Sequence, residues 1–445
     1  MPPITQPEPE MLTVEINGHP ERFEWRSENG SPIPSKLELI DDTCAADHAL
    51  RLASAGTSLL WNGDFQNARH LLQAMARRLD KRIQKRGANK LKPSPSSLTS
   101  LTSLTSLTSP KLQVKYKNHK DHDLANQRSE QTSDVMGEGL RGLFDEFREH
   151  QRYRAQILGR LLIPVSAEHT IKLKRAPDIS NAYVQAYGSA TQARILSLRE
   201  LQGIISAYEW RKKGVEIDLR AEGLGSVKIT PHYGVFSPIR GEYLRLVASS
   251  TLPQSINSDS SAFDIGTGTG VLALILARKG IQNIVATDQS SRAIACATEN
   301  IQMQGSGSKI DVRQENLYPK DPLTHQNLKA SLIICNPPWL PGPSSGALDS
   351  AVYDPGSQML KGFLTGLGQH LHLGGEGWLI MSDLAEHLGL RSRAELMQWI
   401  DAAGLEVLAK TDVRPEHKKA RDSSDPFFKA RSSEVTSLWR LGVRK

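Results

Sequence analysis

Two hydrophobic patterns divide the chain. Up to about residue 213, apolar residues recur with the spacing of an amphipathic helix. Beyond residue 261, short apolar runs alternate with helical stretches. The first pattern predicts a mainly helical leader, and the second predicts a parallel sheet with helices between its strands.

In the leader, helices are expected at 65–85, 139–161 and 196–213. Asp64 is a good N-cap for the first of these helices. The stripe that this helix would bury consists of Leu71, Leu72, Met75 and Leu79. A short hairpin is expected over 12–25, because Asn17-Gly18 is a turn signal between two alternating stretches.

The second half predicts a Rossmann-like, doubly wound α/β sheet. Strands are expected at 262–265, 283–287, 309–313, 331–335, 377–381 and 406–409. Helices are expected at 270–279, 290–303, 358–370 and 393–402. The stretch 434–442 predicts a final antiparallel strand. Ligands of such sheets bind beyond the carboxyl ends of the strands.

These patterns predict three regions. Residues 1–38 are expected to be a loosely ordered tail, 39–230 a helical leader or substrate domain, and 231–445 the catalytic domain. A low-complexity insert interrupts the leader at 88–134, where Ser-Leu-Thr is repeated between residues 97 and 108. Such a run cannot bury a core, so the insert is expected to be disordered.

Charge is concentrated in one segment. The net charge is +7, yet residues 69–120 alone contain 13 Lys and Arg against one acid, Asp80. This segment either contacts nucleic acid or another acidic partner, or is a solvated helix end and linker. No apolar run is long enough to span a bilayer, and three widely spaced cysteines indicate a reducing, cytoplasmic setting. We expect no membrane partner and no metal site.

A glycine loop follows the first strand of the predicted sheet. It runs from Asp264 through Gly266, Thr267 and Gly268 to Gly270, where a helix begins. Glycines there let the backbone turn sharply and approach a ligand. Asp288 ends the next strand, where a carboxylate can accept hydrogen bonds from ribose hydroxyls.

The loop favours S-adenosylmethionine (SAM) over a nicotinamide cofactor. Dinucleotide sites use G-x-G-x-x-G, but the spacing here is G-x-G-x-G. The negative Asp264 would repel a pyrophosphate and suits the cationic amino end of a methionine moiety. Asn316, after the third strand, is the expected contact for the adenine edge; an ordinary turn residue is the alternative.

The stretch Asn336-Pro337-Pro338-Trp339 follows the apolar strand 331–335. Methyl transfer needs the acceptor lone pair aligned with the sulfur–methyl axis. Asn336 Oδ1 and the Pro337 carbonyl would each accept an N–H of a planar nitrogen, and Trp339 would stack on it. A strand terminator followed by a core Trp is the structural alternative.

From Asp264 to Gly270, at Asp288 and from Asn336 to Trp339, residues 230–445 resemble the class I SAM-dependent methyltransferases of the "small domain" kind. That group includes release-factor glutamine methyltransferases and amino-directed methyltransferases of rRNA and DNA bases. The resemblance implies that Phe236 and Arg240, in the segment entering the fold, line the cofactor pocket. The Trp at position 339, where Tyr is usual in the glutamine enzymes, and the longer leader are departures from that group.

We therefore expect a SAM-dependent N-methyltransferase. Its acceptor is expected to be an amine or amide, with a peptide-derived or secondary-metabolite small molecule as the specific candidate. The alternatives are a protein glutamine, an RNA or DNA base amino group, and a SAM-binding protein without catalysis.

Overall fold

The computed structural model describes residues 10–16, 18–90, 122–189, 191–238, 241–344, 347–415, 422–423 and 425–444. Side chains are described outside 84–90, 122–138 and 347–348. The chain forms two compact units. Unit 1 comprises residues 1–33, 164–172 and 177–445, and unit 2 comprises 34–163 and 173–176.

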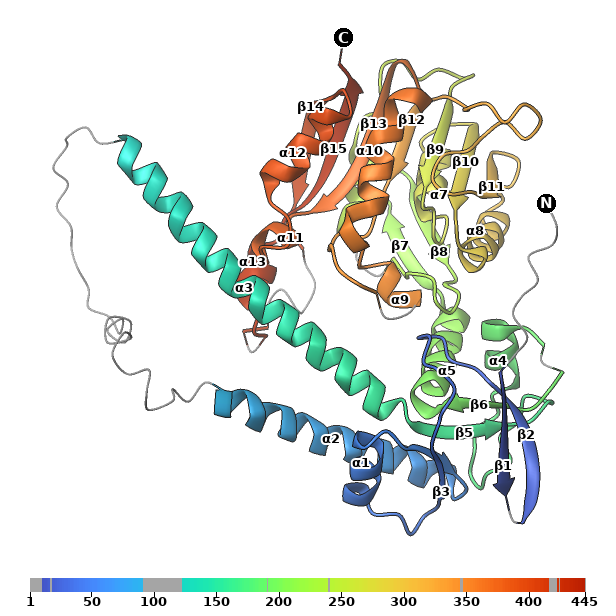
Figure 1. Cartoon of the computed structure of the whole chain (residues 1–445). Helices are drawn as coiled ribbons and strands as arrows, with labels where there is room; N and C mark the ends of the chain where they lie inside the picture. Colours follow the sequence, from blue (N-terminus) through green and yellow to red (C-terminus); the bar gives the residue numbers. More distant parts are fainter. Residues whose placement is uncertain are drawn as a thin grey trace. The chain divides into compact units, whose positions relative to one another are not determined.

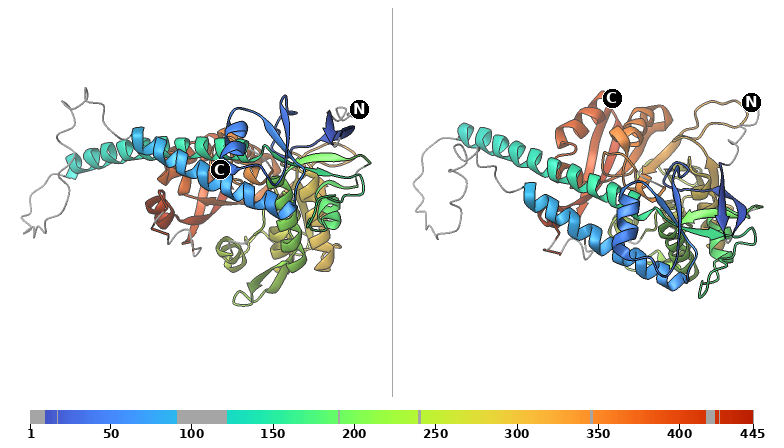
Figure 2. Two further views of the ribbon diagram at one scale, coloured as in Figure 1. Left: turned by 90° about the horizontal axis from the view of Figure 1, so that it is seen from below. Right: turned by 60° about the horizontal axis from the view of Figure 1, so that its bottom comes forward.

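The described part of unit 2 combines three parallel strands with three helices (Figure 1). The elements are β3 (Leu37–Ile40), α1 (Ala46–Ser54), β4 (Ser58–Trp61), α2 (Phe65–Lys90), α3 (His122–Leu158) and β5 (Leu161–Val165), the last of which ends in unit 1. Strand β4 pairs in parallel with both β3 and β5. Helices α2 and α3 pack on one another (Figure 2). Arg154 Nε of α3 donates to Asp80 Oδ1 of α2 (2.8 Å).

The first part of unit 1 consists of short elements. They are β1 (Met11–Ile16), β2 (His19–Trp25), α4 (Ser180–Tyr187), β6 (Arg194–Ser197), α5 (Leu198–Lys213), β7 (Val215–Leu219), β8 (Gly225–Ile229) and α6 (Glu242–Ser249). Strands β1 and β2 form the predicted hairpin, and Gly18 at its turn has φ of +78°. Strand β2 continues into parallel pairing with β6.

The rest of unit 1 is the predicted α/β fold. Its first half contains β9 (Ser261–Ile265), α7 (Val271–Arg278), β10 (Asn283–Asp288), α8 (Ser291–Met303), β11 (Ile310–Gln314), β12 (Ala330–Cys335), α9 (Ala347–Ser350) and the 3-10 turn η1 (Pro355–Ser357). Its second half contains α10 (Gln358–His370), β13 (Leu371–Ser382), α11 (Leu384–His387), α12 (Arg393–Ala402), β14 (Leu405–Val413), α13 (Phe428–Ser433) and β15 (Thr436–Val443).

One seven-stranded sheet organises these elements in the order β11-β10-β9-β12-β13-β15-β14. The strands from β11 to β13 are parallel, and β15 is antiparallel to β13, as predicted. Helices α6, α7 and α8 cover one face, and α10 and α12 cover the other (Figure 1). Because both faces are covered, the central strands are mostly apolar, and Asp264 in β9 is a buried exception.

The leader is mainly helical, as predicted, but it also contains strands that were not predicted, from β3 to β8. Residues 10–38, expected to be a loose tail, contain β1, β2 and the start of β3, and the part up to residue 33 folds with unit 1.

The predicted region boundaries also differ from the compact units. Unit 1 takes in residues 177–230, which the prediction assigned to the leader. The helix expected at 139–161 begins at His122 and ends at Leu158, and α2 continues to Lys90. Both helices thus enter the ends of the insert predicted at 88–134. Its Ser-Leu-Thr repeats lie outside the described residues.

Candidate active site

Three central strands end side by side at the edge of the sheet where the candidate residues lie. Ile265 is aligned with Cys335 on one side and with Thr287 on the other. The next residues along these strands are Gly266, Asn336 and Asp288. Neighbouring strands are about 4.8 Å apart. The sheet register therefore brings the glycine loop, the acid and the Asn-Pro-Pro-Trp stretch together.

The glycine loop is fixed mainly by backbone hydrogen bonds. The N–H groups of Gly266 and Thr267 both donate to the Thr287 carbonyl, at 2.8 and 2.9 Å. Gly270 has φ of +81°, and a Cβ there would lie 3.3 Å from the backbone of Ala297 in α8. At Gly268, with φ of +55°, a Cβ would meet nothing within 4 Å. The loop thus packs tightly at its helix end and is open at its centre.

Asp264 is fully buried beneath this loop. Its Oδ2 accepts hydrogen bonds from Thr267 Oγ1 (2.6 Å) and from the Ala273 backbone N–H (3.0 Å). Its Oδ1 is buried and has no hydrogen-bond partner. Burial, which these hydrogen bonds only partly offset, raises the pKa of Asp264 to about 6. A cationic ligand group at Oδ1 would satisfy this atom, which fits the amino end of SAM.

Asp288 braces the loop from the neighbouring strand. Its Oδ2 accepts the Gly268 backbone N–H (3.1 Å), and its Oδ1 accepts that of Ser290 (2.9 Å). Burial raises the pKa of its carboxyl, and the backbone hydrogen bonds oppose that rise. Each carboxylate oxygen has a second lone pair, which leaves acceptor capacity for two ribose hydroxyls.

Asn316 is exposed and lies in the turn that follows β11. The preceding residue, Glu315, donates its backbone N–H to the Asp288 carbonyl (3.1 Å). The following residue, Leu317, accepts a hydrogen bond from Thr287 Oγ1 at its carbonyl (2.6 Å). These contacts anchor the turn beside β10, and the adenine contact of Asn316 stays a prediction.

The Asn-Pro-Pro-Trp stretch is ordered by one side-chain contact. Trp339 Nε1 donates to Asn336 Oδ1 (2.9 Å). Trp339 is half-buried and packs against the cores on both faces of the sheet. Pro337 is buried, whereas Asn336 is half-buried. The indole N–H therefore fixes the orientation of the Asn336 amide, a contact that the sequence did not predict.

The segment after this stretch folds back onto the loop. Leu340 and Asp354 are joined by a backbone hydrogen bond (2.9 Å), and the buried Asp354 carboxylate accepts the N–H groups of Met359 and Leu360, both at 3.1 Å. A Cβ at Gly266 would overlap Met359 Cε. Met359 therefore contacts the glycine loop, and no sequence signal marked it or Asp354.

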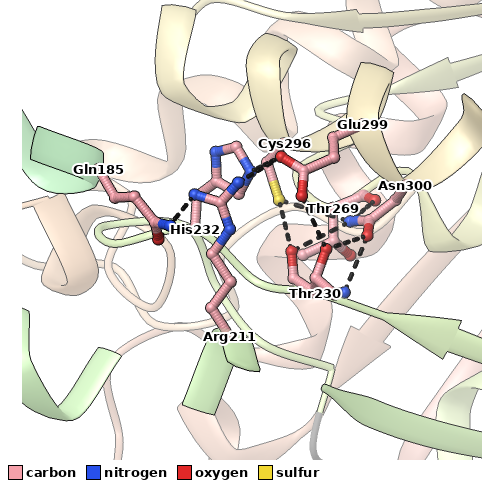
Figure 3. A network of polar contacts seen from close by, with 8 residues as sticks. All are labelled: Gln185, Arg211, Thr230, His232, Thr269, Cys296, Glu299 and Asn300. Atoms are coloured by element: carbon pink, nitrogen blue, oxygen red, sulfur yellow. Dashed lines mark hydrogen bonds and ion pairs between the residues drawn. The ribbon is translucent and has the colours of Figure 1, made fainter. Parts of the chain in front are cut away.

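A polar network connects residues 230–238, which follow β8 and are called the entry segment below, to the glycine loop (Figure 3). Asn300 of α8 is fully buried. Its Oδ1 accepts from the backbone N–H and Oγ1 of Thr230, at 2.8 and 2.9 Å, and its Nδ2 donates to the Thr269 carbonyl (3.0 Å). Sequence reasoning missed Asn300. The available signal was a polar residue on the otherwise small and apolar buried stripe of α8.

Glu299 extends this network outward. It accepts hydrogen bonds from Arg211 of α5 and from His232 Nε2 (2.8 Å). Burial raises the pKa of Glu299, but the bonds from Arg211 and His232 outweigh that effect and keep the pKa below its usual value. Burial lowers the pKa of His232 despite the Glu299 contact. The ionised Glu299 therefore links α5 to the entry segment.

The remaining two candidates are less well tied to the site. Phe236 is 38% exposed, one residue after Val235, which packs against Ala293 and Cys296 of α8. Arg240 lies outside the described residues. The described part of the chain contains no group of three or more His, Cys, Asp or Glu suited to a metal. Nor does any described helix have the length and apolar character to cross a bilayer.

Comparison with known proteins gives one family match. Residues 226–390 match the model "Methyltransferase small domain". A relative from Methanocaldococcus jannaschii, named "Putative protein N5-glutamine methyltransferase", is 27% identical over 164 residues, which are 36% of this chain and 77% of the relative.

Two further relatives match over shorter shares of their length. The release factor glutamine methyltransferase of Cereibacter sphaeroides is 28% identical over 169 residues, covering 35% of this chain and 55% of the relative. The tRNA1(Val) (adenine(37)-N6)-methyltransferase of Parabacteroides distasonis is 40% identical over 76 residues, covering 17% of this chain and 31% of the relative.

Among solved structures, a SAM-dependent methyltransferase from Thiobacillus denitrificans in complex with S-adenosyl-L-homocysteine superposes with a TM-score of 0.32 and 14% identity, covering 47% of this chain and 92% of that one. The family match, the relatives and the sheet order identify a class I, SAM-dependent methyltransferase domain. Its cofactor is S-adenosylmethionine.

Proposed function

We propose that the protein transfers a methyl group from SAM to a planar nitrogen of a macromolecule, with the side-chain amide of a protein glutamine as the first candidate. The observation that supports this most is the register of β9 and β12. It puts Asn336 one strand spacing, about 4.8 Å, from the start of the glycine loop. A nitrogen held at Asn336 is then within reach of a methyl group bound over that loop.

Bound SAM would supply an electrophilic methyl group on a sulfonium centre. As the N–C bond forms the S–CH3 bond breaks, S-adenosyl-L-homocysteine leaves as a neutral thioether, and one N–H proton of the acceptor passes to water. The protein's task is orientation, because the acceptor lone pair must point along the sulfur–methyl axis. The lone pair of an amide nitrogen is delocalised into its carbonyl. Asn336 Oδ1 and the Pro337 carbonyl would accept the two N–H groups and favour a more pyramidal nitrogen.

Trp339 has a different role in this proposal from the stacking expected from the sequence. Its Nε1 donates to Asn336 Oδ1. An amide oxygen has two lone pairs, so Oδ1 retains one for the acceptor nitrogen. Trp339 thus holds the Asn336 amide with its oxygen as the acceptor and prevents the amide from flipping.

The cofactor side of the proposal assigns Asp264 to the amino end of SAM and Asp288 to its ribose. Asn316 and Phe236 would border the adenine, and Arg240 remains a candidate for the pocket wall. The backbone of Gly266, Thr267, Gly268 and Gly270 would line the space where the methionine moiety lies.

A base amino group in RNA is the second candidate, because one relative is named for methylation of adenine in tRNA. The basic segment 69–120 would then contact phosphates, and turnover would fall steeply with salt. A small-molecule amine acceptor, expected from the sequence, gains no support from the relatives' names.

The test is incubation of the protein with methyl-labelled SAM and a cell extract, followed by separation of protein, RNA and small molecules. We expect label on glutamine in the protein fraction. The control is Asn336→Ala, which should bind SAM normally and transfer no label. Label in RNA would select the second candidate, and SAM binding without any labelled product would contradict the proposed activity.

A further inference from the structure

Helix α8 contacts the proposed SAM site at three points, one at Asp288 and two on the glycine loop. Its first turn follows Asp288 directly, and Ser290, its N-cap, donates a backbone N–H to that carboxylate (2.9 Å). A Cβ at Gly270 would lie 3.3 Å from Ala297, so α8 packs closely on this glycine. Asn300 donates to the Thr269 carbonyl. A shift of α8 would therefore move both the acid and the glycines of the proposed SAM site.

Glu28, which is 264 positions from Arg292 in the sequence, binds the first turn of α8. Arg292 Nη1 and Nη2 donate to the two carboxylate oxygens of Glu28, at 2.6 and 2.9 Å. Arg292 Nη2 also donates to the Ala186 carbonyl at the end of α4 (3.1 Å). The side chains of Arg292 and Glu28 are 29% and 18% exposed, so the pair is well shielded from water.

Glu28 is itself held firmly. Its backbone N–H donates to Glu200 Oε2 (3.2 Å), and Glu200 also accepts from the Tyr187 hydroxyl. Burial raises the pKa of Glu28, but the bonds and charges of Arg292 and Arg26 outweigh this and hold the pKa below its usual value. Glu28 is therefore ionised at neutral pH and anchored on both its backbone and its side chain.

The same cluster reaches the entry segment. The Arg292 guanidinium lies 5.5 Å from the centre of the Tyr233 ring, and Tyr187 meets that ring edge-on at 6.0 Å. A second ion pair binds α8 further along the helix, where Arg211 of α5 donates to Glu299 (Figure 3). Glu28, Ala186 and Arg211 all precede residue 226, where the family match begins. The residues that bind α8 through these contacts therefore lie outside the domain that matches the family model.

We propose that the chain ahead of the methyltransferase domain positions the SAM site through α8, with Glu28 and Arg292 as positioning residues. The inference rests on the proposed function, since it assumes that the loop and Asp288 hold SAM. Arg292 is four residues after Asp288, about one helical turn. Fixing its guanidinium fixes the turn that carries the hydrogen bonds to Asp288.

The experiment measures SAM binding by calorimetry in the full chain, so that no acceptor is needed. Glu28→Gln removes the charge and keeps the size and the backbone bond to Glu200. Because this ion pair holds the turn that carries the hydrogen bonds to Asp288, we expect its loss to lower SAM affinity about tenfold, which corresponds to about 1.4 kcal/mol.

Asp218→Asn is the matched control. Its carboxylate also accepts two bonds from one guanidinium, that of Arg220, at 2.9 and 2.7 Å, but both side chains are exposed and neither contacts α8. We expect its SAM affinity to equal that of the unaltered protein. If Glu28→Gln does not fold, Glu28→Asp is measured in its place. This variant retains the charge on a shorter side chain, so a smaller loss of SAM affinity is expected.

A purely structural role for the pair predicts another result. The Glu28 variants would then unfold at a lower temperature but bind SAM with unchanged affinity when folded, and this outcome would overturn the inference alone. Failure of the unaltered protein to bind SAM would instead overturn the proposed function, and the inference with it.

Discussion

Replacing Asp264 with Asn tests the cofactor side of the account. The change keeps the shape of the side chain, and the amide oxygen can still accept the bonds from Thr267 Oγ1 and the Ala273 N–H. The buried Oδ1, which has no partner in the protein, becomes an NH2 group. An NH2 group cannot accept a hydrogen bond from the amino end of SAM.

The expected losses follow from these contacts. A hydrogen bond to a charged group contributes about 1.5–3 kcal/mol, so SAM affinity should fall by about 10- to 150-fold. The free energy of unfolding of the ligand-free protein should not fall by a comparable amount. The pKa of Asp264 is raised from 3.8 to about 6, which corresponds to about 3 kcal/mol of penalty for the ionised side chain. The amide does not have this penalty, but its buried NH2 group costs about 1–3 kcal/mol.

The same pKa predicts a pH dependence in the unaltered protein. The unfolded chain loses the Asp264 proton near pH 4, and the folded protein holds it to about pH 6. The contribution of this group to stability is thus full below pH 4 and is lost as pH rises to about 6. SAM binding depends on pH in the opposite direction, because it needs the ionised carboxylate. SAM affinity should therefore fall below about pH 6.

Calorimetric titration of SAM from pH 5 to 8, with urea unfolding in parallel, measures both effects. Thr267→Val is the control, since it removes one bond to Asp264 without changing the charge. Equal loss of SAM affinity in Thr267→Val and Asp264→Asn would assign the effect to loop shape. SAM affinity that is unchanged in Asp264→Asn, or that is flat across this pH range, would refute the reasoning.

Three further predictions concern other parts of the site. Trp339→Phe keeps the ring but removes the N–H that orients Asn336, so kcat should fall about tenfold with SAM affinity unchanged; an unchanged kcat would argue against the orienting role. Asn300→Ala leaves two buried backbone groups unpaired and should lower the free energy of unfolding by about 3 kcal/mol; a loss below about 1 kcal/mol in urea unfolding would show that water replaces the amide. Gly270→Ala forces a side chain into a left-handed backbone against α8 and should destabilise the protein by about 1–3 kcal/mol, whereas Gly280→Ala, also at positive φ but in open space, should cost less in the same unfolding assay.

The sequence predicted the catalytic half closely. Its strands are buried on both faces, so they appear as short apolar runs between helical stretches, and the glycine loop and Asn336 follow such runs. The leader strands were missed because β3 and β4 are four residues long. A short apolar run cannot be told from a piece of helix by its periodicity.

The connections between distant segments could not be predicted. Glu28 and Arg292 are 264 positions apart, and nothing in either local pattern indicates the other. Asn300 was visible as a polar residue on a buried stripe, but its partners Thr230 and Thr269 lie on other elements. The Trp339–Asn336 bond is local, yet it depends on a side-chain orientation that the strand pattern does not specify.

The most direct test of the central claim is transfer of labelled methyl from SAM to extract components by the unaltered protein and by Asn336→Ala. The account predicts a methylated nitrogen with the unaltered protein, and SAM binding without transfer with the variant. Equal transfer by the two proteins, or label on carbon or oxygen only, would contradict it.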